Sequence, residues 1–145
     1  MAITLREMSI EDYNAAYQLW ETSPGVGLSS SDAYDSIARY LDRNPGLSFV
    51  ACDGPKLIGT VLGGHDSRRG YIYHLAVDLA YRKRGIGRDL VGHCIAALGK
   101  NGIEKCHIFV FGTNDDALAF WKNCGWTERV ELVILSKYTA PGDGS

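Results

Sequence analysis

The chain has 145 residues, of which 46% are hydrophobic, and this suits one domain with its own core but is too short for two. A formal net charge of -2 and a pI near 6.0 argue against general nucleic-acid binding, which usually requires a strongly basic domain or face. No apolar run approaches the roughly 18 residues that span a bilayer, and the first residues lack the pattern of a signal peptide, so we expect a cytoplasmic protein without membrane contact.

The cysteines and histidines do not form a recognisable metal or redox pattern. The four cysteines lie far apart, with no C-x-x-C pair, and we expect them to be reduced and mostly buried. The four histidines show neither H-x-x-x-H nor H-E-x-x-H spacing. We therefore expect no metal cofactor.

The N-terminal part predicts a strand and two helices. Ser9 and Asp12 resemble a capping pair that opens a helix, and Ile37 with Leu41 gives the second helix an apolar row. The expected elements, in chain order, are a strand over 2–7, a helix over 9–21, a loop over 22–30 and a helix over 31–43.

The middle of the chain changes to a period of two, which is typical of strands. The expected strands are 47–52, 57–62 and 71–77, and the short turns between them predict an antiparallel meander. Gly63 and Gly64 would weaken the middle strand and indicate a bulge there.

The last third predicts alternating helices and strands. Apolar residues recur every fourth position from Ile86 to Leu98, which indicates a helix with one buried face. Asn114 is a strong cap for the next helix, and Gly125 is well placed to end it. The expected elements are a helix over 86–101, a strand over 103–111, a helix over 114–125, a strand over 129–137 and a disordered tail over 139–145.

The order of these elements predicts an α/β fold. It is strand, helix, helix, three strands, helix, strand, helix, strand. We expect one domain over 1–138 with a mixed, mainly antiparallel central sheet and helices on both faces.

A basic glycine loop carries the strongest functional signal. Arg82-Lys83-Arg84-Gly85-Ile86-Gly87 follows a strand and opens a helix, where successive backbone N–H groups can bind a pyrophosphate. The glycines let the main chain approach the ligand, and Arg88 adds a fourth positive charge. A solvated basic turn is the simpler alternative. No P-loop pattern is present, and a dinucleotide-binding oxidoreductase is only a weak competitor because the preceding meander is not a βαβ unit.

Two segments resemble the GNAT superfamily of N-acetyltransferases. The first, 75–87, resembles its acetyl-CoA-binding signature, which is Arg or Gln, two residues, Gly, one residue, then Gly or Ala. The second, 114–126, resembles its later block Asn-x-x-Ala-x-x-Phe-Tyr-x-x-x-Gly-Phe. The order of elements also follows the family, so the resemblance covers nearly the whole chain and is greatest to small stand-alone bacterial members.

The resemblance implies that acetyl-CoA lies in a V-shaped opening between the strands 71–77 and 103–111. Backbone groups of Leu75 and Val77 would bond the pantetheine amides, and Asn114 would reach the pantetheine arm, although a helix cap explains Asn114 equally well. The residues that the resemblance places at the cofactor are Leu75, Ala76, Val77, Arg82, Lys83, Arg84, Gly85, Ile86, Gly87, Arg88, Asn114 and Trp121.

The resemblance also assigns two catalytic candidates, Tyr73 and Tyr71, at the positions where a base often stands in the family. Period-two alternation predicts that both lie on the same face as Leu75, where either phenol could meet the substrate or relay a proton through water. Aromatic packing within a strand is the alternative for each. His74 and His107 are bases of lower rank, and a structural role is the stronger prediction for both.

One family position departs from the pattern. Trp121 stands where the family usually has a tyrosine as general acid, and an indole N–H cannot give up its proton at ordinary pH. The thiolate could then leave unassisted, or Tyr73 could protonate it.

The sequence therefore predicts an enzyme that transfers an acetyl group from acetyl-CoA to a primary amine, on a small molecule, a lysine or a protein N-terminus, by direct attack. The alternative is a CoA-binding regulatory or interaction domain with weak turnover, which Trp121 motivates. In the family the acceptor cleft is bordered by the first two helices, so Glu21, Asp32 and Asp35 would favour a cationic amine, unless they are only solvated helix faces. Exposed strand edges could also support a homodimer.

Overall fold

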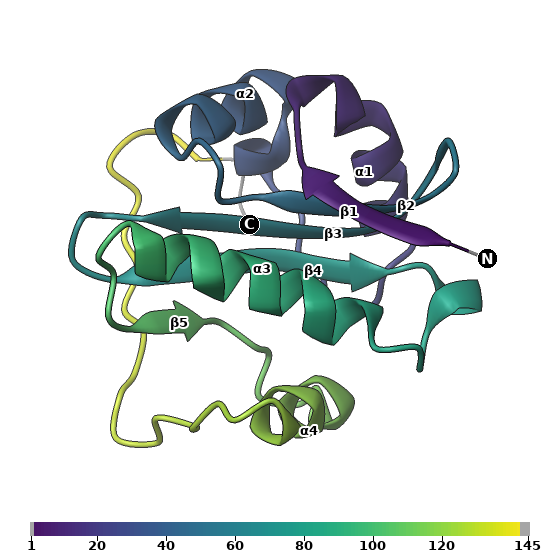
Figure 1. The fold of residues 1–145 in the computed structure, drawn as a ribbon. Coiled ribbons are helices and arrows are strands. Elements are labelled where there is room, and N and C mark those ends of the chain that lie inside the picture. Colours follow the sequence, from purple (N-terminus) through teal and green to yellow (C-terminus); the bar gives the residue numbers. More distant parts are fainter. Residues whose placement is uncertain (1, 143–145) are drawn as a thin grey trace.

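A five-stranded sheet lies at the centre of residues 2–142, the part of the chain that the computed structural model describes (Figure 1). The strands are β1 (Ile3–Glu7), β2 (Phe49–Asp53), β3 (Lys56–His65), β4 (Gly70–Val77) and β5 (Cys106–Ile108), and they lie side by side in that order. Neighbours from β1 to β4 are antiparallel, and β5 is parallel to β4.

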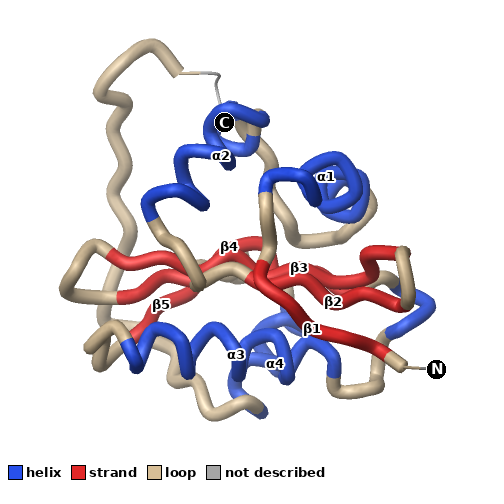
Figure 2. Tube along the Cα trace, turned by 45° about the horizontal axis from the view of Figure 1, so that its top comes forward, coloured by secondary structure: helices blue, strands red, loops and turns tan. Residues whose placement is uncertain are grey.

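Helices cover both faces of this sheet (Figure 2). The helices are α1 (Tyr13–Glu21), α2 (Tyr34–Arg43), α3 (Ile86–Lys100) and α4 (Asp115–Asn123), and the 3-10 turns are η1 (Ile10–Asp12), η2 (Ser30–Asp32) and η3 (Leu79–Tyr81). α1 and α2 lie on one face, and α3 and α4 lie on the other. The predicted α/β class, with a mixed, mainly antiparallel sheet and helices on both faces, is confirmed.

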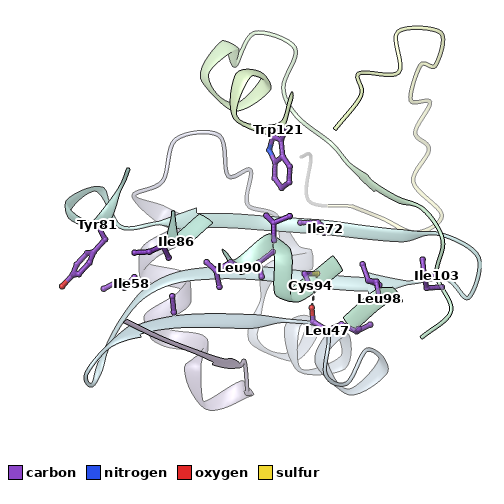
Figure 3. Close-up of a cluster of buried hydrophobic side chains, with 13 residues drawn as sticks. Leu47, Ile58, Ile72, Tyr81, Ile86, Leu90, Cys94, Leu98, Ile103 and Trp121 are labelled. Atoms are coloured by element: carbon purple, nitrogen blue, oxygen red, sulfur yellow. Dashed lines mark hydrogen bonds between the residues drawn. The ribbon is translucent and has the colours of Figure 1, made fainter. Parts of the chain in front are cut away.

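The larger hydrophobic cluster lies under α3 (Figure 3). Leu90, Cys94 and Leu98 are almost fully buried in it, which confirms the apolar row that the sequence predicts for this helix. The Cys94 thiol donates a hydrogen bond of 3.3 Å to the Leu47 carbonyl oxygen, and burial raises the pKa of this thiol to about 12. All four cysteines are unpaired, but only Cys52 and Cys94 are fully buried.

Both predicted helix caps are present. The Ser9 N–H donates to Asp12 Oδ2 over 2.9 Å, where η1 leads into α1. Asn114 Oδ1 accepts from the Ala117 N–H over 3.1 Å at the start of α4, so its side chain is occupied as a cap. The starts of α1 and α4 are therefore set by residues close to them in the sequence.

The bulge predicted at Gly63 and Gly64 is wrong, because both residues stay in register with β4. A Cβ on Gly63 would collide with the Leu47 carbonyl, so the glycine allows close packing instead. The extra residue lies in β4: Thr60 pairs with Ala76 and Leu62 pairs with Tyr73, so one residue of β3 faces two of β4. His74, at this bulge, has a left-handed φ of 50°.

Two predictions for the C-terminal third are also wrong. The strand expected over 103–111 is reduced to β5, Cys106–Ile108, because its pairing with β4 ends where β4 bulges. The strand expected over 129–137 is absent from the described residues, since alternation supplies an apolar face but no partner edge. Its apolar side chains are exposed, and the segment runs from α4 past the sheet toward α2 (Figures 1 and 2).

Two remaining predictions concern the termini and the membrane. The tail predicted over 139–145 falls partly outside the described residues, and its described part contains neither helix nor strand. Among the helices that the structure describes, none combines the length and the apolar character needed to cross a membrane.

Candidate active site

β4 and the edge strand β5 pair over only part of the length of β4. Their pairing ends at Ile72 and Ile108, and no ladder joins them beyond it. The Asp78 N–H donates to Ile58 O of β3 over 2.8 Å, and successive residues of a strand direct their backbone groups to opposite edges. The backbone groups of Val77 and Leu75 therefore face the open edge, where Val77 O accepts from Arg82 Nε over 3.2 Å. Pairing between the two strands therefore stops before the end of β4, as the predicted V-shaped opening requires, and Leu75 and Val77 lie on the unpaired edge of β4.

The basic glycine loop lies between the end of β4 and α3. Gly85 is the residue before α3 and has a φ of 79°, which favours glycine, and Lys83 has a φ of 63°. The first N–H groups of a helix have no partner within it, so those of α3 are available beside the loop. The positively charged side chains here are all exposed: Arg82, Lys83, Arg84 and Arg88. This combination of free N–H groups and cations fits a pyrophosphate.

Two other loop residues attach this surface to the rest of the protein. Ile86 is only 5% exposed and packs in the core cluster under α3. A Cβ on Gly87 would lie 3.4 Å from the Phe120 ring, so this glycine brings the start of α3 close to α4. Ala76 is also buried, on the opposite face with α1 and α2, and it pairs with Thr60 of β3, so the structure does not bring this predicted cofactor residue to the open edge.

Trp121 is part of the core and does not stand free in the opening. Its side chain points from α4 toward the buried cluster (Figure 3), and the residue is 6% exposed. Its ring centroid lies 4.9 Å from that of Trp126 and 5.3 Å from that of Phe120. Packing therefore explains this residue, and its contact with a cofactor stays a prediction.

Tyr73 and Tyr71 form part of an aromatic row on the α2 side of β4. The Tyr71 ring stacks on Phe109 with a centroid distance of 6.0 Å, and the Tyr73 ring lies 6.4 Å from that of Tyr40. Burial, and then the neighbouring Tyr71, raise the pKa of Tyr73, so its phenol stays protonated well above neutral pH. Such a group donates a hydrogen bond more readily than it accepts a proton.

The bulge overturns the predicted alternation along β4. Leu75 packs against the cluster under α3, on the face opposite the aromatic row that contains Tyr73. His74 instead shares the face of Tyr73, because its ring contacts Trp20 of α1 with a centroid distance of 4.7 Å. An unbroken period of two would have placed Tyr73 with Leu75 and directed His74 away.

His74 also has an acidic partner that sequence reasoning missed. Its Nε2 lies 2.6 Å from Asp32 Oδ1, and the two side chains are 13% and 8% exposed. The pair joins β4 to η2 across 42 positions of sequence. Of the acids expected at the acceptor cleft, Glu21 and Asp35 are solvated and Asp32 is not. His107 makes a different contact, with its ring 5.8 Å from that of Tyr71.

The loop at 22–29 reaches across the opening. A Cβ on Gly25 would lie 2.7 Å from Asn114 Nδ2, and one on Gly27 would lie 3.6 Å from the Phe111 ring. Both neighbours lie on the segment that joins β5 to α4, whereas the loop itself leaves α1. The loop after α1 therefore packs against the segment between β5 and α4.

Comparison with known proteins identifies this arrangement. The model of the Acetyltransferase (GNAT) family matches residues 13–126. The chain belongs to the GNAT family of acetyltransferases. An acetyltransferase of Pectobacterium atrosepticum is 31% identical over 127 residues, which cover 88% of this chain and 89% of that protein. The GNAT assignment makes this protein an acetyl-transferring enzyme, of the small bacterial kind that the sequence resembles.

Solved structures share the GNAT fold. Ard1 from Thermoplasma volcanium superposes with a TM-score of 0.77 at 23% identity, over 88% of this chain and 84% of that one. The PaiA N-acetyltransferase from Thermoplasma acidophilum, determined in complex with coenzyme A, gives a TM-score of 0.74 at 19% identity, over 85% and 88%. At these identities the likeness concerns the fold.

Proposed function

We propose that this protein transfers the acetyl group of acetyl-CoA to a primary amine, by direct attack while both substrates are bound. The observation that carries the proposal is the unpaired edge of β4 at Leu75 and Val77, which leads to the basic loop before α3. An extended amide-containing arm can bond to the edge while its pyrophosphate meets the loop. The same fold in a neighbour that holds coenzyme A supports this donor.

The cofactor-binding residues divide into backbone and charged contributions. Leu75 and Val77 would contribute main-chain groups, whereas those of Ala76 face β3. The N–H groups of Ile86, Gly87 and Arg88 would bond the phosphates together with the cations of the loop. The cap bond of Asn114 occupies its Oδ1, so its Nδ2 is the atom that could reach the pantetheine arm. The bound cofactor supplies a thioester carbonyl that an amine can attack.

Tyr73 is better suited to donate a proton or hydrogen bond to the leaving thiolate than to accept a proton from the amine. Its phenol is protonated near neutral pH and is 37% exposed, so it can donate a hydrogen bond to a departing thiolate. Trp121 is buried and its indole cannot deliver a proton, which leaves Tyr73 as the phenol for this step. Tyr71 would position Tyr73 through the aromatic row.

The acceptor is a primary amine on a small molecule, a lysine or a protein N-terminus. The exposed carboxylates of Glu21 and Asp35, on α1 and α2, would favour a cationic amine. We propose that one acetyltransferase domain over 1–138 carries this activity. A homodimer stays a prediction.

A second candidate is a CoA-binding regulatory or interaction domain with weak turnover. The observation that favours it is the burial of Trp121, because this position then provides no general acid. The two candidates share acetyl-CoA binding and differ in acetyl transfer.

An amine screen separates them. Acetyl-CoA binding is measured by calorimetry, and release of free thiol is followed with spermidine, tyramine, amino acids, an aminoglycoside and peptides with a free N-terminus or lysine. The proposal expects thiol release with at least one amine, in step with a product heavier by one acetyl group. Binding without thiol release would favour the regulatory candidate, and absence of binding would contradict both.

A further inference from the structure

The paired side chains of His74 and Asp32 form a buried acid–imidazole group beside Tyr73. The bulge in β4 turns His74 onto the α1 and α2 face, next to the row that contains Tyr73. His74 Nε2 and Asp32 Oδ1 are 2.6 Å apart. The group therefore lies on the acceptor side of β4, one residue from the phenol assigned to the thiolate.

Asp32 is held in place from two directions. Its Oδ2 accepts from the Ser29 N–H over 3.0 Å, which fixes the carboxylate within η2. Its backbone oxygen accepts from the Tyr13 hydroxyl over 2.6 Å, which ties η2 to α1. Oδ1 is thus directed at His74, and a carboxylate there requires the proton of a neutral imidazole to be on Nε2.

The second ring nitrogen of His74, Nδ1, is then a free acceptor. No hydrogen bond to it occurs among residues 2–142, where Tyr40 Oη is the one buried side-chain polar atom without a partner. Because Nδ1 has no hydrogen-bond partner and is not such a buried atom, it is accessible to solvent or ligand. Imidazole is the side chain that exchanges protons near neutral pH, so this atom can accept a proton from an amine.

We propose that His74 is the catalytic base of acetyl transfer, with Asp32 as the positioning residue that fixes its tautomer. This inference rests on the proposed function. A cationic amine first loses one proton to solvent, and its neutral nitrogen then attacks the thioester carbon, so the C–N bond forms as the C–S bond breaks. One N–H proton passes to His74 Nδ1, the C–S electron pair leaves with the thiolate, and a proton from Tyr73 or water converts this to the thiol. His74 then returns its proton to solvent, Tyr73 recovers one if it donated, and amide and CoA thiol are the products.

A purely structural role for the pair predicts different behaviour. If His74 and Asp32 only join β4 to η2, then His74→Gln and Asp32→Asn retain activity, since both amides can still hydrogen-bond across the same gap. If His74 is the base, both variants fail. Gln cannot accept the proton, and an Asn amide donating to Nε2 forces the imidazole proton onto Nδ1.

The test measures kcat/KM for the best amine of the screen in the wild type, His74→Gln and Asp32→Asn, with His107→Gln as the matched control. His107 is also a strand histidine with an aromatic contact, but no acidic partner is described for it. We expect a loss of about 100-fold or more in both variants of the pair, with an unchanged acetyl-CoA Kd, an unchanged melting temperature and a near wild-type control.

The pH profile provides the readout that a structural role would not change. The titratable groups around His74 are Asp32 from η2, Tyr13 from α1 and Tyr73 from β4. Wild-type kcat/KM should fall on the acid side as the base becomes protonated, and this limb should disappear in His74→Gln. Wild-type turnover combined with an active His74→Gln, or with an unaltered acid limb in it, would overturn the inference and leave the proposed function standing. No turnover by the wild type would overturn both.

Discussion

The proposed donor side and the proposed acceptor side of β4 are built in opposite ways. On the donor side, the loop from Arg82 to Arg88 is one short segment whose cations are exposed and whose proposed contacts to the phosphates are mainly backbone N–H groups. On the acceptor side, four buried or half-buried polar side chains come from four different elements. They are Trp20, Asp32, Thr60 and His74.

The difference determines how each side responds to substitution. A loop that binds through its backbone depends on local φ values and on charge, so a variant can lose ligand affinity without losing the fold. A buried network depends on every partner, because a buried polar group that loses its hydrogen-bond partner destabilises the fold. The variants below separate these two kinds of dependence.

The largest expected effect is on acetyl-CoA affinity in Gly85→Glu. Gly85 has a φ of 79° with open space at its Cβ, so the variant adds a negative charge at the phosphates and a strained backbone. Repulsion in a partly screened site should raise the acetyl-CoA Kd about 100-fold or more, measured by calorimetry.

Gly102→Glu is the matched control for that variant. Gly102 has a φ of 81°, also with open space at its Cβ, but it follows the far end of α3. Both variants should lose about 1–2 kcal/mol of unfolding free energy through strain, and only Gly85→Glu should lose the cofactor. Equal Kd values would contradict the location of the phosphate site.

The second-largest expected effect is on the free energy of unfolding, in Thr60→Val, which disrupts the buried network. The Thr60 hydroxyl accepts from Trp20 Nε1 over 2.9 Å and donates to the His74 carbonyl oxygen over 2.8 Å. Valine keeps the shape of the side chain but leaves both partners unsatisfied, so the free energy of unfolding should fall by about 1–3 kcal/mol in urea denaturation.

Thr4→Val on the exposed face of β1 is the control and should change the free energy of unfolding little. The acetyl-CoA Kd of Thr60→Val should equal that of the wild type, whereas kcat/KM for the amine should fall. A parallel loss of cofactor affinity would show that the two sides are not independent.

The contrast also explains what the sequence could predict of the fold. Helices and the strands β1 to β4 follow from local periodicity and caps such as Ser9 and Asn114, which are properties of neighbouring residues. The length of β5 and the fate of 129–137 depend on whether a partner edge is available, and alternation contains no information about that. The bulge depends on the mismatch of two strands, so glycines alone predicted the wrong position.

The candidate site divides in the same way. The loop from Arg82 to Arg88 was predictable because one contiguous segment supplies its charges and its special backbone conformation. The pair of His74 and Asp32 was not, because it spans 42 positions and arises only when the bulge turns His74 to the α1 side. An acid in a capping pattern and a histidine in a strand gave no signal of their contact.

The third effect is on turnover in Tyr73→Phe. The phenol is kept protonated because burial raises its pKa, so it acts as a hydrogen-bond donor across the neutral range. Loss of this donor to the thiolate should lower kcat about tenfold, leave the acetyl-CoA Kd unchanged and retain the acid limb of the pH profile.

Tyr71→Phe is the control for the phenol and should keep the stacking on Phe109 and most of the activity. If the acid limb vanished in Tyr73→Phe, the phenol would be the base and His74 would not. Wild-type kcat in Tyr73→Phe would exclude the phenol from either step.

The smallest expected effect is on the free energy of unfolding, in Asp12→Asn, which removes the ion pair between β1 and η1. Arg6 donates to the two Asp12 oxygens over 2.7 and 2.8 Å, and these hydrogen bonds lower the pKa of Asp12. Because the pKa of Asp12 is lower in the folded chain than in the unfolded chain, where it is near 3.9, the pair stabilises the fold at pH values above that pKa. This stabilisation is lost as the pH falls through the pKa of the folded chain. Because the Arg6 side chain is 51% exposed, the variant should lose less than about 1 kcal/mol at pH 7.

Urea denaturation at several pH values measures this loss, with Asp42→Asn on the exposed surface of α2 as the control. The difference between Asp12→Asn and the wild type should shrink as the pH falls below about 4, where the wild-type carboxylate is itself protonated in the unfolded chain. A difference that persists in acid would mean that Asp12 stabilises the start of α1 through its cap bond to Ser9 and not through Arg6. In either case the loss should stay below that of Thr60→Val, because a solvated pair can replace its partner with water and the buried network cannot.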